Sequence, residues 1–153
     1  MAYNTFTEQN RKNKRLIKID PKEKKIVRAV VQRVTSSKVV VDGKIVGSIN
    51  KGINVLIGIS CDDNEGDLKY IKDKIINLRI FEDENFKMNK SLMDIGGEML
   101  VISQFTLYGD CRKGRRPNFM AALGGEESKK LYDKFILMLK EYGIKVETGI
   151  FGA

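Results

Sequence analysis

Four strand-type segments follow one another in the first half of the sequence, and they limit the folds open to this chain. The runs at 27–34, 38–41, 44–49 and 52–59 are rich in Val and Ile, which strands favour. Asp42-Gly43 separates the second run from the third, and this dipeptide suits the positive φ angles of a type I′ turn. The second and third runs therefore predict a hairpin, and the almost continuously apolar run at 52–59 predicts a central strand.

Two later segments show helical periodicity. Apolar residues recur every three or four positions from Leu68 to Leu78, behind the capping oxygens of Asp62, Asp63 and Asn64. A second helix is predicted over 126–142 and ends before Gly143. We expect it to bury one face, which consists of Leu131, Phe135, Met138 and Tyr142.

Strand-type runs at 98–107 and 144–148 complete the pattern. Strands that precede and interrupt only two helices favour an α+β fold. We therefore expect a mainly antiparallel, barrel-like sheet with both helices packed against it.

The composition excludes several classes of function. The chain has 153 residues, about one ordinary domain, and contains no histidine, so Ser-His-Asp catalysis and His-ligated zinc or haem are excluded. Its two cysteines, Cys61 and Cys111, lie far apart in neither a metal-binding nor a redox spacing. No apolar run approaches the roughly 20 residues of a membrane span. We expect a cytoplasmic protein with reduced cysteines and neither a metal nor a cofactor.

The positive charge is concentrated at the N-terminus. The net charge of the chain is +8, and residues 1–26 hold eight Lys and Arg against three Asp and Glu. This polar segment predicts a flexible basic arm ahead of a domain at 27–153. Two interpretations stay open: the arm contacts RNA phosphates, or it is a solvated tail from a start assigned upstream of Val27.

A polar run ends the strand predicted at 98–107. In an extended strand Ser103 and Phe105 would face one side while Gln104 and Thr106 face the other, so both pairs cannot lie in the core. The run therefore predicts either a binding or acyl-transfer site on a rigid element, or simply a polar strand end.

A basic loop follows this run. Arg112, Lys113, Arg115 and Arg116 lie within five residues beside Gly114 and Pro117. Such a cluster is typical of a phosphate-binding surface, and a solvated basic loop is the alternative.

Four motifs together closely resemble the D-aminoacyl-tRNA deacylase family. They occupy residues 28–34, 103–109, 113–117 and 148–153, in the order of the family, and the resemblance runs from Val27 to Ala153. It implies a metal-independent homodimer that hydrolyses the ester between a D-amino acid and the 3′ adenosine of tRNA, as translation quality control. Glycine mischarged on tRNA-Ala would be a further substrate, and tRNA rather than DNA the nucleic-acid partner.

The resemblance also assigns roles to residues. It implies that Ser103, Gln104, Phe105 and Thr106 form the catalytic pocket. The residues it implies for binding substrate and tRNA are Arg33, Arg112, Lys113, Arg115, Arg116, Phe151 and Gly152.

The chain departs from the family at both ends. Val27 stands where family members start with methionine, and the family continues past Phe-Gly-Ala to a Gly-Pro motif that enters the partner's pocket and that Arg33 would steady. The sequence has only Pro21 and Pro117. The alternatives to an active deacylase are therefore an inactive, truncated deacylase and a non-catalytic basic RNA-binding domain.

Two chemical routes fit the predicted pocket. Thr106 could attack the ester, but without a histidine its hydroxyl would stay protonated and weak. Attack assisted by the tRNA's own 2′-hydroxyl is favoured, with Thr106 and Gln104 as positioning residues. Backbone N–H groups near Phe105 and Thr106 would stabilise the oxyanion.

Overall fold

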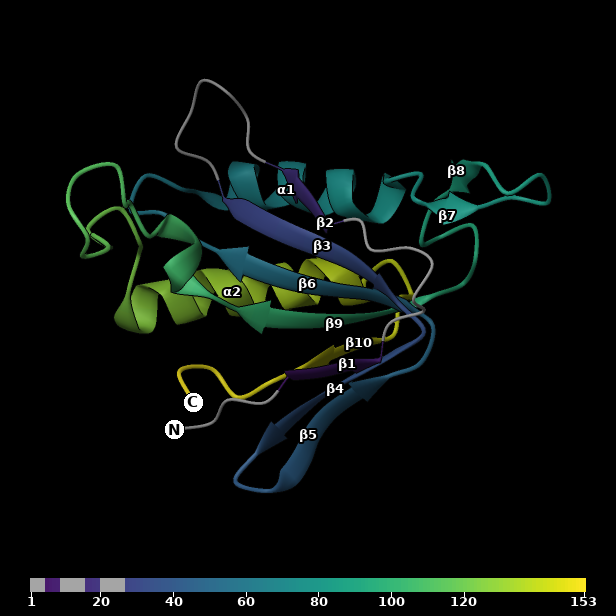
Figure 1. Ribbon diagram of the computed structural model, residues 1–153, viewed down its shortest axis with the longest axis horizontal. Coiled ribbons are helices and arrows are strands. Elements are labelled where there is room, and N and C mark those ends of the chain that lie inside the picture. Colours follow the sequence, from purple (N-terminus) through teal and green to yellow (C-terminus); the bar gives the residue numbers. More distant parts are fainter. Residues whose placement is uncertain (1–4, 9–15, 20–26) are drawn as a thin grey trace.

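The computed structural model describes residues 5–8, 16–19 and 27–153, with side chains described from Val27 onward (Figure 1). A five-stranded sheet occupies the centre in the order β10-β9-β6-β3-β2. Its strands are β2 (Leu16–Ile19), β3 (Arg28–Val34), β6 (Gly52–Gly58), β9 (Glu98–Ser103) and β10 (Val146–Thr148). Because most of 1–26 lies outside the described residues, the flexible basic arm and the domain start at 27 stay predictions.

Two further sheets, two α-helices and a 3₁₀ helix complete the described fold. β1 (Thr5–Glu8), β4 (Ser36–Val41) and β5 (Lys44–Ile49) form a three-stranded sheet, and β7 (Phe81–Glu82) pairs with β8 (Met88–Lys90). The helices are α1 (Glu65–Asn77) and α2 (Gly125–Lys140), and a short 3₁₀ helix, η1, spans Phe105–Tyr108. The α+β class is confirmed.

Five of the seven described strand pairs are antiparallel, so the mainly antiparallel arrangement is confirmed. The exceptions are the two pairs of β9, which runs parallel to both β6 and β10. The reason is that a helix-containing connection precedes β9 and another follows it, and each returns the chain to the same end of the sheet. In the described part of the chain the sheets stay open, so the barrel-like arrangement is not formed.

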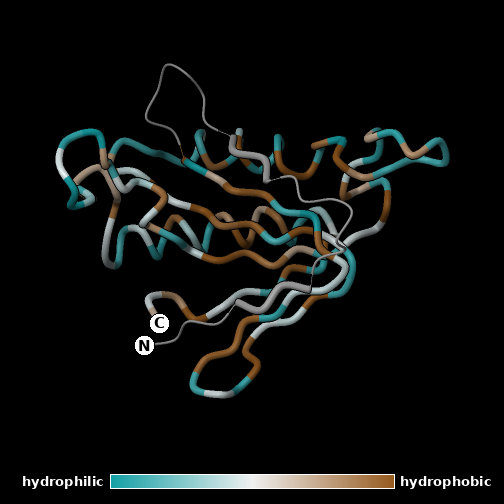
Figure 2. The backbone as a smooth tube through the Cα atoms, in the orientation of Figure 1, coloured by the Kyte–Doolittle hydropathy of each residue, from teal (hydrophilic) through white to brown (hydrophobic). Residues whose placement is uncertain are grey.

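The main core lies between the five-stranded sheet and the helices. β3, β6 and β9 are apolar along most of their length (Figure 2). Fully buried Val31, Val55 and Val101 of these strands pack with Ile71 of α1 and Phe135 of α2. This layer holds β9 and α2 against each other, which fixes the two elements that later border the pocket.

The β4–β5 hairpin packs on the other face of the sheet. Asp42 and Gly43 have φ angles of 48° and 75°, so the predicted Asp-Gly turn is confirmed. At Gly47 a Cβ atom would lie 2.2 Å from the carbonyl oxygen of Thr148, so only glycine lets β5 approach β10 this closely. The hairpin thereby brings Val39 and Val41 beside the end of the chain.

Both predicted helices are present, but the buried face of the second differs from the prediction. α1 starts at an Asn64 N-cap with a capping box. α2 buries Ser128, Tyr132, Phe135, Ile136 and Leu139, whereas the predicted Tyr142 lies beyond its end and is exposed. In the described part of the chain, none of the helices has the length and apolar character that crossing a membrane requires.

Candidate active site

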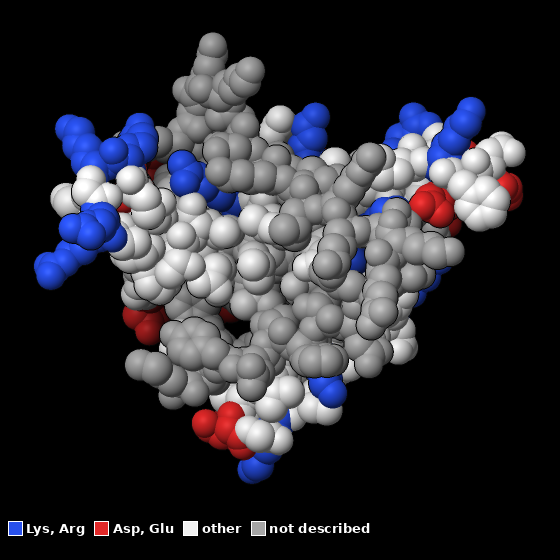
Figure 3. Space-filling model, in the orientation of Figure 1, with Lys and Arg blue, Asp and Glu red and all other residues white. Residues whose placement is uncertain are grey.

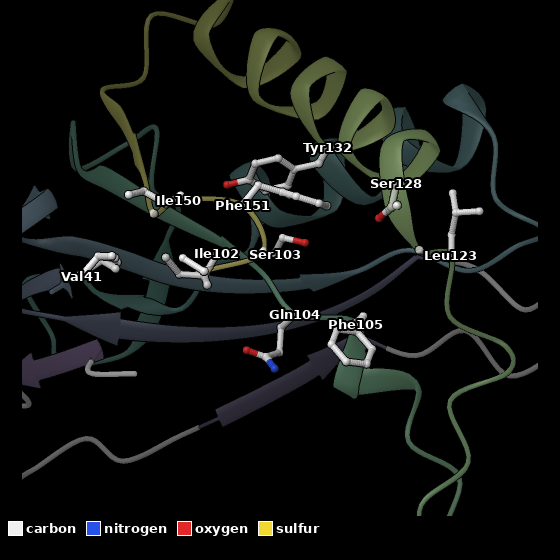
Figure 4. A pocket seen from close by; sticks show the side chains of 16 residues that line it. Val41, Ile102, Ser103, Gln104, Phe105, Leu123, Ser128, Tyr132, Ile150 and Phe151 are labelled. Atoms are coloured by element: carbon white, nitrogen blue, oxygen red, sulfur yellow. The ribbon is translucent and has the colours of Figure 1, made fainter. Parts of the chain in front are cut away.

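A pocket of about 650 Å³ opens beside the carboxyl end of β9 (Figure 4). β4 forms one apolar side of it, the first turns of α2 form another, and residues 149–153 close it. The residues that line it include Val39, Val41, Ile102, Ser103, Gln104, Phe105, Ser128, Tyr132, Phe151 and Gly152. The pocket therefore unites four segments that are separate in sequence.

The strand predicted at 98–107 ends early, at Ser103. The backbone N–H of Gln104 donates to the carbonyl oxygen of Ile57 at 2.7 Å, and the chain then turns into η1. The predicted alternation of faces is therefore wrong: Ser103, Gln104 and Phe105 all line the pocket. Thr106 is not among the lining residues, and its exposed hydroxyl accepts a hydrogen bond from the Gln104 side chain.

A partly buried polar cluster packs against η1 and holds it in place. Asp63 accepts a hydrogen bond from the Ser60 backbone N–H at 2.5 Å, and the Tyr108 hydroxyl donates to the same carboxylate at 3.5 Å. Burial raises the pKa of Asp63 and also that of Tyr108. Arg28 donates to the carbonyl oxygen of Leu107 at 2.9 Å and stacks over the Tyr108 ring. This cluster fixes the turn that presents Gln104 and Phe105.

Phe151 and Gly152 lie in the pocket wall, and their role in binding substrate stays a prediction. The Phe151 ring packs 5.6 Å, centroid to centroid, from that of Tyr132. Tyr132 is held in turn, because its hydroxyl donates to the buried Val101 carbonyl oxygen at 2.9 Å and burial raises its pKa. Tyr132 therefore stays protonated, and its hydroxyl is occupied by the bond to Val101. It forms part of the pocket wall and does not act as an acid or base toward the substrate.

Ser128 is a pocket residue that the sequence reasoning missed. It lies in the first turn of α2 and is only 5% exposed, yet it lines the cavity. The structure gives its hydroxyl no hydrogen-bond partner among the described residues. In Figure 4 the hydroxyl groups of Ser103 and Ser128 point toward one another. The signal in the sequence was its helical spacing from Tyr132 and Phe135, which marks the buried face.

The basic loop lies outside the pocket lining. Paired backbone bonds between Asp110 and Asn118, of 2.8 and 2.9 Å, close its base. Arg112 folds back on Asp110, donating from Nη2 at 2.6 Å, and this hydrogen bond lowers the pKa of Asp110 to about 2.

The other three cations of the loop remain available. Lys113, Arg115 and Arg116 are exposed. In Figure 3, Lys and Arg side chains gather at the left end of the molecule, where Figure 1 shows this loop. No ion pair of these three is found within the described residues.

Arg33 is not brought to the pocket. It pairs in register with Ile53, whereas the pocket begins near Ile57, four residues further along β6. Its guanidinium donates to the carbonyl oxygen of Ile80 at 2.6 Å. The role of Arg33 in binding substrate or tRNA stays a prediction, and the described structure places this residue away from the pocket.

The described residues form no candidate metal centre. No group of three or more Cys, Asp and Glu side chains comes close enough to hold an ion in this part of the chain. The pocket offers hydroxyl, amide and backbone groups, which suit positioning and charge stabilisation.

Known proteins match most of the chain. The family model described as D-Tyr-tRNA(Tyr) deacylase matches residues 30–153. Proteins named D-aminoacyl-tRNA deacylase from Clostridium perfringens (strain 13 / Type A) and Clostridium beijerinckii are 69% and 72% identical over 127 residues. Each match covers 83% of this chain and 85% of the relative.

Two solved structures share the fold. One, described as c-Myc DNA Unwinding Element Binding Protein, has a TM-score of 0.77 and 42% identity, over 82% of this chain and 85% of its own. The other, described as a probable eukaryotic D-amino acid tRNA deacylase, has a TM-score of 0.70 at 19% identity, over 82% of this chain and 89% of its own. With the family model and the close relatives, these matches establish that the chain belongs to the D-Tyr-tRNA(Tyr) deacylase family.

Proposed function

We propose that this chain hydrolyses the ester bond of D-aminoacyl-tRNA and releases tRNA and the free D-amino acid. The observation that carries the proposal is the position of the 103–105 motif. In a chain of this family it lines a pocket of about 650 Å³, and a basic loop starts seven residues further on, at Arg112. A pocket of this size suits an aminoacyl-adenosine, and a nearby cluster of cations suits the phosphates that precede it.

The arrangement favours positioning over nucleophilic catalysis by the protein. Thr106 points to no base, since its contact is with the Gln104 amide, and the chain has no histidine. We therefore retain the route in which the tRNA's 2′-hydroxyl assists attack and Gln104 positions the reacting groups. The amides of Phe105 and Thr106 open η1, and a 3₁₀ helix has no internal acceptor for its first amides. They supply donors for the developing oxyanion.

Release of labelled tyrosine from D-Tyr-tRNA tests the proposal. The chain should release it faster than buffer alone, and Gln104→Ala should slow the release. L-Tyr-tRNA measures chirality, and glycyl-tRNA-Ala tests the wider substrate range. RNA retention without ester release would instead support a non-catalytic RNA-binding domain. Absence of both would support an inactive deacylase.

The assembly and the partner are further parts of the proposal. We expect a homodimer in the cytoplasm that binds tRNA and not DNA, because the family resemblance implies it. Light scattering of the purified chain measures the oligomeric state, and a twofold monomer mass is the expected result. Competition with single-stranded DNA of the same sequence as the tRNA 3′ end tests the nucleic-acid preference.

A further inference from the structure

Three large apolar side chains are exposed between the pocket and the basic loop. Phe105 is 54% exposed, Phe119 36% and Met120 86%. Phe105 belongs to the pocket wall, while Phe119 follows directly after the base of the loop. Exposed aromatic side chains beside cations are typical of surfaces that bind single-stranded nucleic acid.

The Phe119 ring is held in place by two contacts. It packs edge-to-face on Phe105, with ring centroids 5.4 Å apart. It also lies against Gly109, where an added Cβ would come within 3.0 Å of the ring. Asn118 accepts a hydrogen bond from the Met120 N–H at 2.8 Å, which fixes the backbone around it. Phe119 thus presents an ordered aromatic surface, and order lowers the entropic cost of binding.

We propose that Phe119, supported by Phe105, stacks on the base that precedes the terminal adenosine in the single-stranded 3′ end of tRNA. This rests on the proposed function. If the terminal aminoacyl-adenosine occupies the pocket and Lys113, Arg115 and Arg116 bind phosphates further along the strand, the preceding nucleotide crosses Phe119. Stacking on an aromatic ring tolerates any base, so this contact recognises a single-stranded end without reading its sequence.

The experiment compares two substrates that differ only in the nucleotides before the adenosine. D-Tyr-tRNA contains them, and D-tyrosyl-adenosine lacks them. Phe119→Leu should raise the KM for D-Tyr-tRNA by about tenfold, from the usual effect of removing one stacking contact. It should leave kcat, and both constants for D-tyrosyl-adenosine, within about twofold of the wild type. Phe119→Tyr should keep the wild-type KM, because it retains the aromatic face.

A matched control and a binding assay complete the design. Phe86→Leu makes the same change at a phenylalanine that is 84% exposed in the β7–β8 turn. It should change neither KM nor kcat for either substrate. A tRNA with 2-aminopurine at the next-to-last position should lose fluorescence on binding the wild type but not Phe119→Leu.

The outcomes separate the inference from the function on which it rests. Equal KM increases for both substrates would overturn stacking and show that Phe119 only shapes the pocket through Phe105. Unchanged KM and unchanged quenching would overturn it as well. If the wild type cleaves neither substrate, the proposed function fails, and the quenching difference still decides whether Phe119 stacks on the base.

Discussion

Neutralising the basic loop should flatten the salt dependence of tRNA binding, and the structure indicates which cations matter. Lys113, Arg115 and Arg116 are exposed without an ion pair among the described residues, whereas Arg112 is held by Asp110 through Nε and Nη2. The hydrogen bond from Arg112 lowers the pKa of Asp110 to about 2, so the carboxylate stays ionised even in mildly acidic buffer. The carboxylate already neutralises Arg112, so three of the four cations are available for phosphates.

The size of the effect follows from counterion release. Each lost contact lowers the slope of log K against log salt by about 0.7 on a single strand and about 0.9 on a duplex. The triple variant Lys113→Ala, Arg115→Ala, Arg116→Ala should therefore lose about 2.1–2.7 of slope. Between 50 and 200 mM salt, the wild type should lose about 20- to 40-fold more affinity than the triple variant.

Fluorescence anisotropy of labelled tRNA across this salt range measures the slope. Arg112→Ala is the matched control within the loop, and it should change the slope by less than a third of the triple-variant effect. An unchanged slope in the triple variant would show that the loop is a solvated surface that does not contact tRNA phosphates. A change for Arg112→Ala as large as for each of the others would refute the argument from the Asp110 pair.

The remaining predictions concern the pocket and its support. Ser128→Ala should raise the KM for D-Tyr-tRNA about two- to tenfold, the range of one hydrogen bond, without lowering the melting temperature. Thr106→Val should reduce kcat in single-turnover assays by less than about tenfold, since a lost nucleophile would cost far more. Burial raises the pKa of Asp63, so its stabilising contribution is present below the usual Asp pKa and is lost as the pH rises through the folded value. Asp63→Asn should therefore raise the melting temperature at pH 7 by about 1–3 °C, and the gain should vanish near pH 3, as followed by thermal unfolding at both pH values.

Features set by neighbouring residues could be predicted from the sequence. The Asp42-Gly43 turn needs positive φ angles that these two residues tolerate, and both adopt them. The α1 start was assigned to a short acidic run, and Asn64 caps the helix with help from Asp67. In each case the stabilising interactions lie within a few residues, so no knowledge of the fold was needed.

Features that depend on distant contacts could not be predicted in the same way. Nothing local distinguishes Ser103 from Gln104, yet β9 ends between them. The Gln104 N–H still donates to the Ile57 carbonyl oxygen of β6, and the chain then turns into η1. Similarly, a polar residue such as Ser128 is expected on the surface, but it lies on the buried face of α2 together with Tyr132 and Phe135. The hydrogen bond of Arg33 could not be predicted either, because its acceptor, the Ile80 carbonyl oxygen, lies beyond α1 in the sequence.

The parallel pairing of β9 explains why the functional motifs meet at one place. Had β9 and β10 been antiparallel, Ser103 and the residues after Thr148 would lie at opposite ends of the sheet. Because the two strands run parallel, their carboxyl ends share one edge, where α/β sheets commonly bind ligands. β6 ends there too, and the Leu123 N–H donates to its neighbour Ile59 at 2.8 Å. The end of β9 and the residues after β9 and β10 therefore line one pocket together with β4 and α2. A substitution that disturbs this pairing should impair the site without touching a lining residue.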